Sequence, residues 1–173
     1  MKITLYTDGS SKGNPGLGGW GVYVEIEKNK TIFKIEISGG QKLATNNQME
    51  LTAGIKALEY LKGDLEKILK NSSVKTEGLK IKIKTDSQYM KNGIEIWIKN
   101  WEKNNWKGSN KKEVLNKDLW QKLLELKNFI NNKLLLDNYE TIKFEYVKAH
   151  IGINGNEIAD RLANKAADNF VKY

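Results

Sequence analysis

Apolar and polar side chains alternate along residues 2–8, which is the period of a β-strand with one buried face. The same alternation returns at 19–27 and 31–39, and a short polar link joins these two runs. Residues 9–19, between the first and second runs, hold five glycines and the only proline of the chain. We therefore expect a turn over 9–19 within an antiparallel meander of three strands.

Apolar residues recur at helical spacing after 45–47, where three capping side chains stand, and they predict a helix to about residue 62. Further along, the pattern predicts a short helix and loop at 63–78, a strand at 79–86, a helix opened by 87–90, a helix at about 114–131, a strand at 141–150 and a helix at 157–170. This order predicts an α/β fold, a mixed sheet with helices packed on its faces. No linker or repeat divides the chain, so we expect one domain over 1–173.

Cysteine is absent and histidine occurs once, which excludes disulfides, thiolate nucleophiles, zinc ribbons and iron–sulfur clusters. Any bound metal must therefore be held by oxygen. The formal net charge of +8 favours a polyanionic partner, although a generic lysine-rich surface explains it equally well. No apolar run reaches the length of a membrane helix, about 18 residues, and the N-terminus lacks the pattern of a secretory signal. We expect a cytoplasmic protein without membrane contact.

Four acidic residues stand where expected elements begin or end. Asp8 and Asp86 end strands, while Glu50 and Asp160 fall in the first turns of helices. Each has an ordinary explanation, since aspartate is common in turns and acidic groups complement the dipole at a helix N-terminus. Together they indicate more, because carboxylates from neighbouring elements can converge at the strand ends of such a sheet. Converging carboxylates repel one another unless divalent cations neutralise them, and oxygen ligands suit Mg²⁺ or Mn²⁺. We therefore predict a two-metal site.

Four stretches of the chain carry a resemblance to a known family. They read YTDGSSKGNPGLGGWG at 6–21, TNNQMEL at 45–51, TDSQY at 85–89 and KAHIGINGNEIADRLA at 148–163. Each contributes one of the four acidic residues, and their order makes the combination specific. The chain resembles the type 1 ribonuclease H family over nearly its whole length. The resemblance implies a ribonuclease H-like fold, in which three antiparallel and then two parallel strands form a five-stranded mixed sheet with helices on both faces.

The resemblance also implies an activity, the endonucleolytic hydrolysis of the RNA strand of an RNA–DNA hybrid to 5′-phosphate and 3′-hydroxyl ends. The family's catalytic residues fall on Asp8, Glu50, Asp86, His150 and Asp160. By resemblance, Asp8 bridges two Mg²⁺ ions, for which Mn²⁺ can substitute. Asp86 lies on the nucleophile side, Glu50 lies on the leaving side, and Asp160 completes a shell. We expect a monomer without an organic cofactor, acting on RNA primers and R-loops.

Two residues near the last acidic position have competing interpretations. Histidine exchanges protons near neutral pH, and His150 lies in a loop with Gly152 and Gly155. This position suits water activation or product release, and the alternative is an exposed histidine without a role. Asn156 matches the family block and is expected near the substrate, but it is also a good N-cap for the last helix.

Further contacts with the hybrid are expected from the glycine-rich stretch after Asp8. Glycine lets backbone groups approach the minor groove, where a protein recognises the 2′-hydroxyl of RNA. The resemblance places Thr45 at a phosphate of the DNA strand. The other substrate contacts that it implies in this part of the site are Gly9, Ser10, Asn14, Asn46 and Gln88.

Residues 97–112 combine three tryptophans with five lysines and one glutamate, a local charge of 5 − 1 = +4. The helical spacing of Trp97 and Trp101 favours core packing for part of the aromatic set, but it does not explain the lysines. In the family this segment is a basic handle that grips the non-cleaved DNA strand, and we expect it at about 91–113. The contacts implied there are Trp97, Lys107, Lys111 and Lys112.

The chain departs from the family pattern in the long interval between Glu50 and Asp86, where we expect a peripheral insertion at about 63–78. Ala149 also stands where glycine is expected before the histidine. Two alternatives to a free-standing nuclease remain, namely a ribonuclease H domain of a reverse transcriptase and a non-catalytic hybrid-binding module of the same fold. The second predicts a lost carboxylate, yet all four are present.

Overall fold

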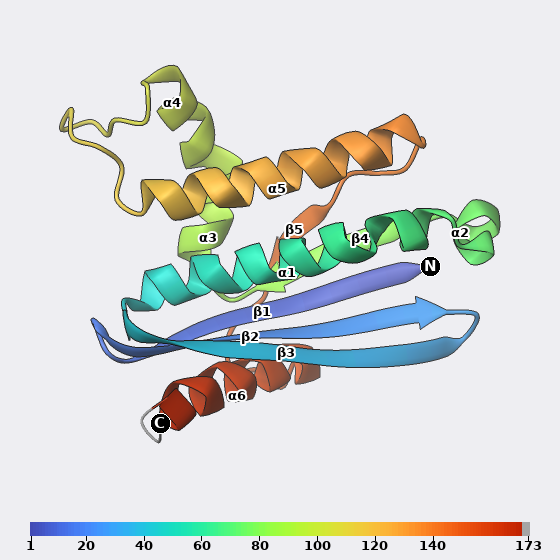
Figure 1. Cartoon of the computed structure of the whole chain (residues 1–173), viewed down its shortest axis with the longest axis horizontal. Helices are drawn as coiled ribbons and strands as arrows, with labels where there is room; N and C mark the ends of the chain where they lie inside the picture. The colour runs from blue at the N-terminus through green and yellow to red at the C-terminus, as the bar shows by residue number, and fades with distance from the viewer. Residues whose placement is uncertain (171–173) are drawn as a thin grey trace.

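Five strands form one mixed sheet in the order β3-β2-β1-β4-β5 in the computed structural model, which describes residues 1–170 (Figure 1). The strands are β1 (Lys2–Gly13), β2 (Gly16–Lys28), β3 (Thr31–Ala44), β4 (Lys80–Thr85) and β5 (Lys143–Tyr146). Central β1 runs antiparallel to β2 and parallel to β4. The predicted α/β sheet, three antiparallel strands followed by two parallel ones, is confirmed. Residues 171–173 of the expected domain lie outside the described part.

The predicted turn over 9–19 is wrong, because both strands continue through it. Gly9 pairs with Trp20 and Gly13 pairs with Gly16, so only two residues connect β1 to β2. Asp8 therefore lies within β1 rather than at its end. Glycine in a strand also marks places where another backbone approaches closely, and here that use outweighs its preference for turns.

The helices of the described residues are α1 (Asn46–Leu69), α2 (Ser72–Glu77), α3 (Gln88–Asn92), α4 (Ile98–Lys103), α5 (Lys117–Leu136) and α6 (Asn154–Asn169), with a π-helix, η1 (Gly93–Trp97), between α3 and α4. The capping predicted before α1 is confirmed. The Thr45 hydroxyl accepts a hydrogen bond from the Gln48 backbone N–H at 3.1 Å, and the Gln48 side chain accepts one from the Thr45 N–H at 2.9 Å. This capping box determines where α1 begins.

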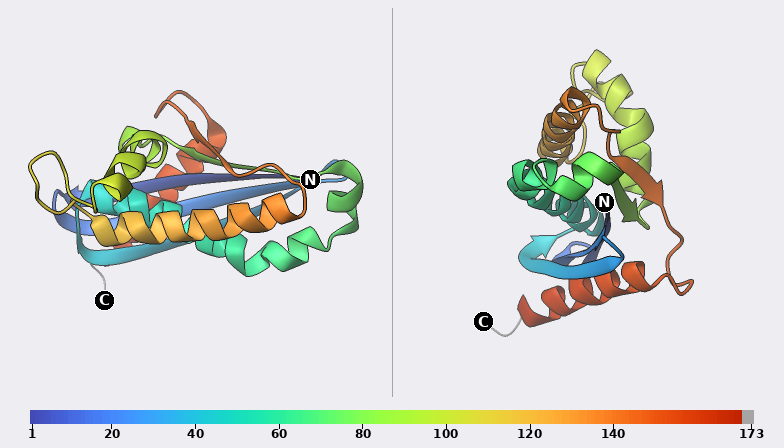
Figure 2. Two further views of the ribbon diagram at one scale, coloured as in Figure 1. Left: turned by 90° about the horizontal axis from the view of Figure 1, so that it is seen from above. Right: turned by 90° about the vertical axis from the view of Figure 1, so that its right-hand side faces the viewer.

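Helices cover the two faces of the sheet in two layers (Figures 1 and 2). α1 lies on one face with α5 packed beside it, and α6 lies on the other. The hydrophobic core lies between the sheet, α1 and α5, and it is filled by fully buried side chains such as Leu5, Leu58, Ile83 and Trp120. No helix in this described part is both long and apolar enough to cross a membrane.

The segment expected to be a peripheral insertion, 63–78, holds the end of α1 and all of α2. It contributes Leu65, Ile68 and Val74 to the core. Since α1 continues to Leu69 rather than ending near residue 62, the segment lengthens a core helix at the end of the molecule far from the handle (Figure 1).

The start of α6 differs from the expectation in a way that bears on the site. Ile153 is the N-cap of α6, so the expected N-cap role of Asn156 is wrong. Asp160 falls in the second turn of α6, and Glu50 falls in the second turn of α1, rather than in the first turns. The helix-dipole effect fades beyond the first turn, so dipole compensation does not explain either carboxylate.

Small residues bring α6 against β2. A Cβ on Gly19 would lie 2.0 Å from the carbonyl oxygen of Ala163, and one on Gly21 would lie 2.5 Å from that of Ala159. Only glycine permits this approach of strand and helix. The packing holds α6 across the sheet and brings Asp160 toward β1.

Candidate active site

Three carboxylates from three different elements meet where β4 ends beside the middle of β1. Asp8 projects from β1, Asp86 follows β4, and Glu50 comes from α1. β1 and β4 are parallel, with Thr7 opposite Thr85, so the aspartates that follow these two residues stand side by side. One carboxylate oxygen of each acidic residue lies within 4.8 Å of those of the other two.

Glu50 reaches this cluster because α1 packs directly on the backbone of β1. A Cβ on Gly9 would lie 2.2 Å from the carbonyl carbon of Met49 and 2.3 Å from the backbone nitrogen of Glu50. Burial is the largest influence on the pKa of Glu50 and raises it, while the nearby Gly9 backbone N–H lowers it. The glycine after Asp8 thus determines how closely the two carboxylates approach.

Asp86 is held between a strand and a helix cap. The backbone N–H of Ser87 donates to the Thr85 hydroxyl at 3.0 Å, and the Ser87 hydroxyl accepts from the Met90 N–H at 3.1 Å as the N-cap of α3. The backbone on both sides of Asp86 is therefore constrained. Its side chain also accepts a hydrogen bond at 3.4 Å from the amide of Asn156 on α6.

Asp160 approaches from the opposite helical layer. It is half-buried and lies within hydrogen-bond reach of the Asp8 side chain, but it is not part of the tight triad of Asp8, Glu50 and Asp86. The structure therefore brings all four predicted carboxylates into one region, with three tightly clustered and the fourth at their edge.

The electrostatics of the triad favour bound positive charge. Burial raises the pKa of Asp8, and the neighbouring Glu50 and Asp86 carboxylates raise it further. Burial also raises the pKa of Glu50, with a further contribution from Asp86. One Glu50 oxygen, Oε2, is buried and has no hydrogen-bond partner among residues 1–170. An all-oxygen donor set with mutual repulsion and an unpartnered buried oxygen fits a hard divalent cation such as Mg²⁺ or Mn²⁺.

A cleft of about 390 Å³ opens over these carboxylates. The predicted residues that line it are Asp8, Gly9, Ser10, Asn46, Glu50, Asp86, Gln88, His150 and Asp160. Four further lining residues were not predicted, namely Asn47, Ser87, Tyr89 and Ala149. Each of these four is adjacent in the sequence to a predicted residue and lies in one of the stretches that resemble the family, and these are the signals that could have found them.

His150 is exposed at the edge of this cleft, in the loop between β5 and α6. Its backbone has a φ of 57°, a left-handed conformation that is uncommon for a residue with a side chain. Gly152 shares the loop, but Gly155, expected there as well, lies within α6. The His150 side chain thus lies beside the carboxylates on a loop that belongs to neither β5 nor α6.

Asn156, expected near the substrate, is buried and faces a carboxylate instead. Its amide nitrogen donates to Asp86, while its Oδ1 is buried and meets no hydrogen-bond partner in the described part of the chain. Asn14 and Thr45 lie outside the lining of the cleft. The Asn14 side chain accepts from the Asn46 backbone N–H at 3.0 Å, so the tip of the β1–β2 hairpin meets the beginning of α1.

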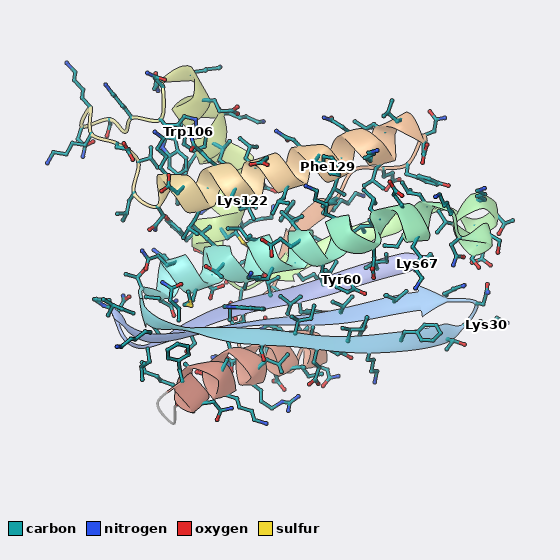
Figure 3. All side chains as sticks on the ribbon, in the orientation of Figure 1. Lys30, Tyr60, Lys67, Trp106, Lys122 and Phe129 are labelled. Carbon is teal, nitrogen blue, oxygen red and sulfur yellow. The ribbon has the colours of Figure 1, made fainter. Side chains whose placement is uncertain are left out.

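Trp97 and Trp101 belong to an aromatic cluster that packs against the core. The cluster also holds Tyr89, Trp106 and Trp120, with adjacent ring centroids 5.1–6.4 Å apart. Trp106 lies at the base of α4 near the start of α5 (Figure 3). The core-packing interpretation therefore holds for both tryptophans, although both are only half-buried.

The lysines of the expected handle have a different environment. Lys107, Lys111 and Lys112 are exposed in the loop after α4, which projects from the molecule beside α3 and α4 (Figure 1). The Gly108 backbone N–H donates to the Lys112 carbonyl at 2.8 Å, and Lys107 pairs with Glu113 in an isolated antiparallel bridge. These bonds shape the loop, while its lysine side chains remain in solvent.

Comparison with known proteins decides the family. The family model described as RNase H matches residues 1–168. The chain belongs to the ribonuclease H family. The resemblance seen in the sequence is confirmed, and the matched range contains all four carboxylates of this ribonuclease H together with His150.

Relatives of this ribonuclease H match it over nearly their full length. A Ribonuclease H of Ruthia magnifica subsp. Calyptogena magnifica is 42% identical over 167 residues, which covers 96% of this chain and 96% of the relative. The Ribonuclease H of Francisella tularensis subsp. novicida is 44% identical over 168 residues, which covers 95% of this chain and 90% of the relative. Among solved structures, LC11-RNase H1 in complex with an RNA/DNA hybrid is 25% identical with a TM-score of 0.65, covering 98% of this chain and 99% of that chain. The ribonuclease H described here is accordingly a nuclease.

Proposed function

We propose that this ribonuclease H is a metal-dependent endonuclease that hydrolyses the RNA strand of RNA–DNA hybrids and leaves 5′-phosphate and 3′-hydroxyl ends. The observation that carries the proposal is the convergence of Asp8, Glu50 and Asp86 at an open cleft, with Asp160 at their edge. A module that only binds nucleic acid has no use for buried carboxylates that repel both one another and phosphate. The solved relative LC11-RNase H1 in complex with an RNA/DNA hybrid supports the choice of substrate.

The four carboxylates are the proposed ligands of two Mg²⁺ ions, for which Mn²⁺ can substitute. When bound, such ions lower the pKa of an attacking water and stabilise the leaving 3′-oxygen. Asp8, on the central strand β1, is the residue proposed to contact both ions. His150, exposed beside the cleft, is the proposed carrier of a proton during water activation or product release.

The cleft residues next to the carboxylates are proposed to hold the strand that is cut. Gly9 and Ser10 follow Asp8 on β1, Asn46 begins α1, and Gln88 begins α3, so three elements present polar groups to one strand. Asn14 and Thr45 lie beyond the lining and are proposed to contact the hybrid further along, with Thr45 at a DNA phosphate. For Asn156, the burial and the bond to Asp86 favour a role behind the substrate.

The exposed loop lysines are proposed to bind phosphates of the uncut DNA strand, as in the family handle at about 91–113. Lys107, Lys111 and Lys112 offer charge without competing ion pairs among the described residues. We propose that Trp97 supports this segment chiefly through its aromatic neighbours. One domain acting as a cytoplasmic monomer on primers and R-loops, without an organic cofactor, completes the proposal.

The test compares labelled RNA–DNA hybrid, duplex RNA and duplex DNA, each with Mg²⁺, with Mn²⁺ and with a chelator. We expect metal-dependent cutting of the hybrid's RNA strand alone. Binding without cutting under every metal condition would instead assign the chain to the non-catalytic class.

A further inference from the structure

Asn164 lies one helical turn after Asp160 and fills the space between that carboxylate and β1. Its amide nitrogen donates to the Asp160 side chain at 3.2 Å and to the Asp160 backbone carbonyl at 3.0 Å. Its amide oxygen accepts from the Ser10 hydroxyl at 2.8 Å and from the Lys12 ammonium at 3.3 Å. One amide therefore makes four hydrogen bonds and joins α6 to the segment of β1 that follows Asp8.

The direction of these bonds leaves one orientation for the amide. Lys12 can only donate, and an ionised Asp160 can only accept, so the oxygen must face β1 and the nitrogen must face Asp160. Reversing the amide would set its nitrogen against an ammonium group and its oxygen against a carboxylate. Lys12 is itself held by Asp168 at 3.6 Å, which secures the β1 side of the network.

Asp160 depends on such an anchor because burial alone does not fix its side chain. Asp8 and Glu50 are buried, whereas Asp86 and Asp160 are only half-buried. Each of these two aspartates accepts a hydrogen bond from an asparagine of α6, Asp86 from Asn156 and Asp160 from Asn164. The Asp160 side chain would otherwise turn freely toward solvent. The Asn164 N–H restricts it to a conformation near Asp8. Groups that orient metal ligands in this way commonly change metal affinity when they are removed.

We propose that Asn164 is the positioning residue of Asp160, holding that carboxylate ready for the metal and linking it to Ser10 on β1. The inference rests on the proposed function, since it assigns Asp160 to metal binding. In this role Asn164 itself touches neither metal nor substrate. The bond to Ser10 matters because Ser10 lines the cleft, so a nucleic-acid strand that displaces its hydroxyl would also act on Asn164.

The experiment measures Mg²⁺ and Mn²⁺ binding by calorimetry without nucleic acid. Asn164→Leu keeps the approximate volume and removes all four hydrogen bonds, and Asn164→Ala tests the same loss in a smaller side chain. We expect the affinity of the metal site that Asp160 completes to fall about 10- to 100-fold in both variants. Activity on the hybrid should recover at high metal concentration with KM for the hybrid unchanged. Asn169→Ala, an exposed asparagine later on α6, is the matched control and should behave as wild type.

A double-mutant cycle separates positioning from a merely structural role. In an Asp160→Asn background, Asn164→Leu should have no further effect on metal affinity, because the ligand it positions is gone. An equal loss in both backgrounds, or a loss of thermal stability with unchanged metal affinity, would overturn the inference. If the wild type itself neither binds the metals nor cuts the hybrid, the proposed function fails as well. If the wild type does both and Asn164→Leu binds metal normally, only this inference fails.

Discussion

A Cβ on Gly9 would lie 2.3 Å from the backbone nitrogen of Glu50, closer than side-chain carbons approach other atoms in proteins. Gly9 directly follows Asp8, so the contact between β1 and α1 is made at the point where two carboxylates must meet. The neighbouring contact with Met49 is equally short and involves backbone atoms, which cannot turn away as a side chain can. Glycine at this position is thus a requirement of the site's geometry.

Replacing Gly9 by alanine should therefore push α1 away from β1. We expect Gly9→Ala to lower the free energy of unfolding by about 1–3 kcal/mol, as overpacking does, and to lower cleavage further by separating Asp8 from Glu50. The matched control is Gly63→Ala, also within α1, where an added Cβ meets nothing within 4 Å. Gly63→Ala should gain about 0.5–1 kcal/mol from helix propensity. Denaturant unfolding and initial cleavage rates check both, and equal stability of the two variants would contradict the described packing.

Removing one carboxylate charge should abolish cleavage without abolishing binding. Asp8→Asn and Asp86→Asn keep the shape of the site but weaken its hold on metal, which we expect to lower kcat about a thousandfold or more. Hybrid binding, measured in a chelator, should stay close to wild type or strengthen slightly, because less negative charge faces the phosphates. Strong cleavage by either variant would remove the carboxylates from the proposed mechanism.

The raised pKa of Asp8 predicts how the metal-free protein responds to pH. Unfolded aspartate titrates near pH 4, whereas folding raises the pKa of Asp8 above that value, so the native state holds its proton more tightly. Its stabilising contribution is therefore fully present below about pH 4 and is lost as pH rises toward the raised pKa. Asp8→Asn does not titrate, so with a chelator its stability advantage over wild type should grow from about pH 5 to about pH 8.

Unfolding by urea at several pH values measures this difference. Groups far from the site titrate alike in both proteins, so comparing wild type with Asp8→Asn cancels their effect. Glu50 is the exception, because Asp8 itself influences the pKa of Glu50. Added Mg²⁺ should stabilise the wild type more than the variant, because only the wild type keeps the full ligand set. A stability difference that stays constant across this pH range would contradict the assigned shift.

The strands and the mixed sheet were predictable because they depend on local patterns, whereas the parallel pair beside three antiparallel strands was implied by the family resemblance. Asp8 and Asp86 were expected to meet because each stood where a strand was expected to end. In the structure Asp8 lies within β1, and the two aspartates meet because the parallel register sets Thr7 opposite Thr85. The turn over 9–19 failed for a physical reason. A glycine in the sequence does not reveal whether it forms a turn or allows a helix to pack closely on a strand. That depends on its contacts, and Gly9 and Gly19 contact residues that are distant in the sequence.

The ends of the helices, and the residues that support the site, were harder to predict because they also depend on contacts with residues distant in the sequence. Asn154 and Gly155 are typical turn residues, so the pattern delayed the start of α6 and made Asn156 an N-cap. Leu65 and Ile68 are separated by lysine and glutamate, which hid their burial in the core. The hydrogen bond between Asn164 and Ser10 joins residues 154 positions apart in the sequence, and no local pattern predicts it.

The exposed lysines after α4 should contribute to the salt dependence of hybrid binding if they contact phosphates. Each phosphate interaction that is removed should reduce the slope of log binding constant against log salt by about 0.9, whatever the sequence of the hybrid. Changing Lys107, Lys111 and Lys112 together to glutamine should therefore weaken hybrid binding at low salt and flatten its salt dependence.

The control triple, Lys30, Lys67 and Lys75 to glutamine, removes the same charge from exposed positions, and Figure 3 shows the first two at the other end of the molecule. General charge acts over about a Debye length, so it would affect both triples at low salt, whereas direct contact affects only the first. Titrations of a labelled hybrid at several salt concentrations with a chelator measure both slopes without cleavage. Equal slopes for the two triples would show that the loop attracts nucleic acid only through net charge.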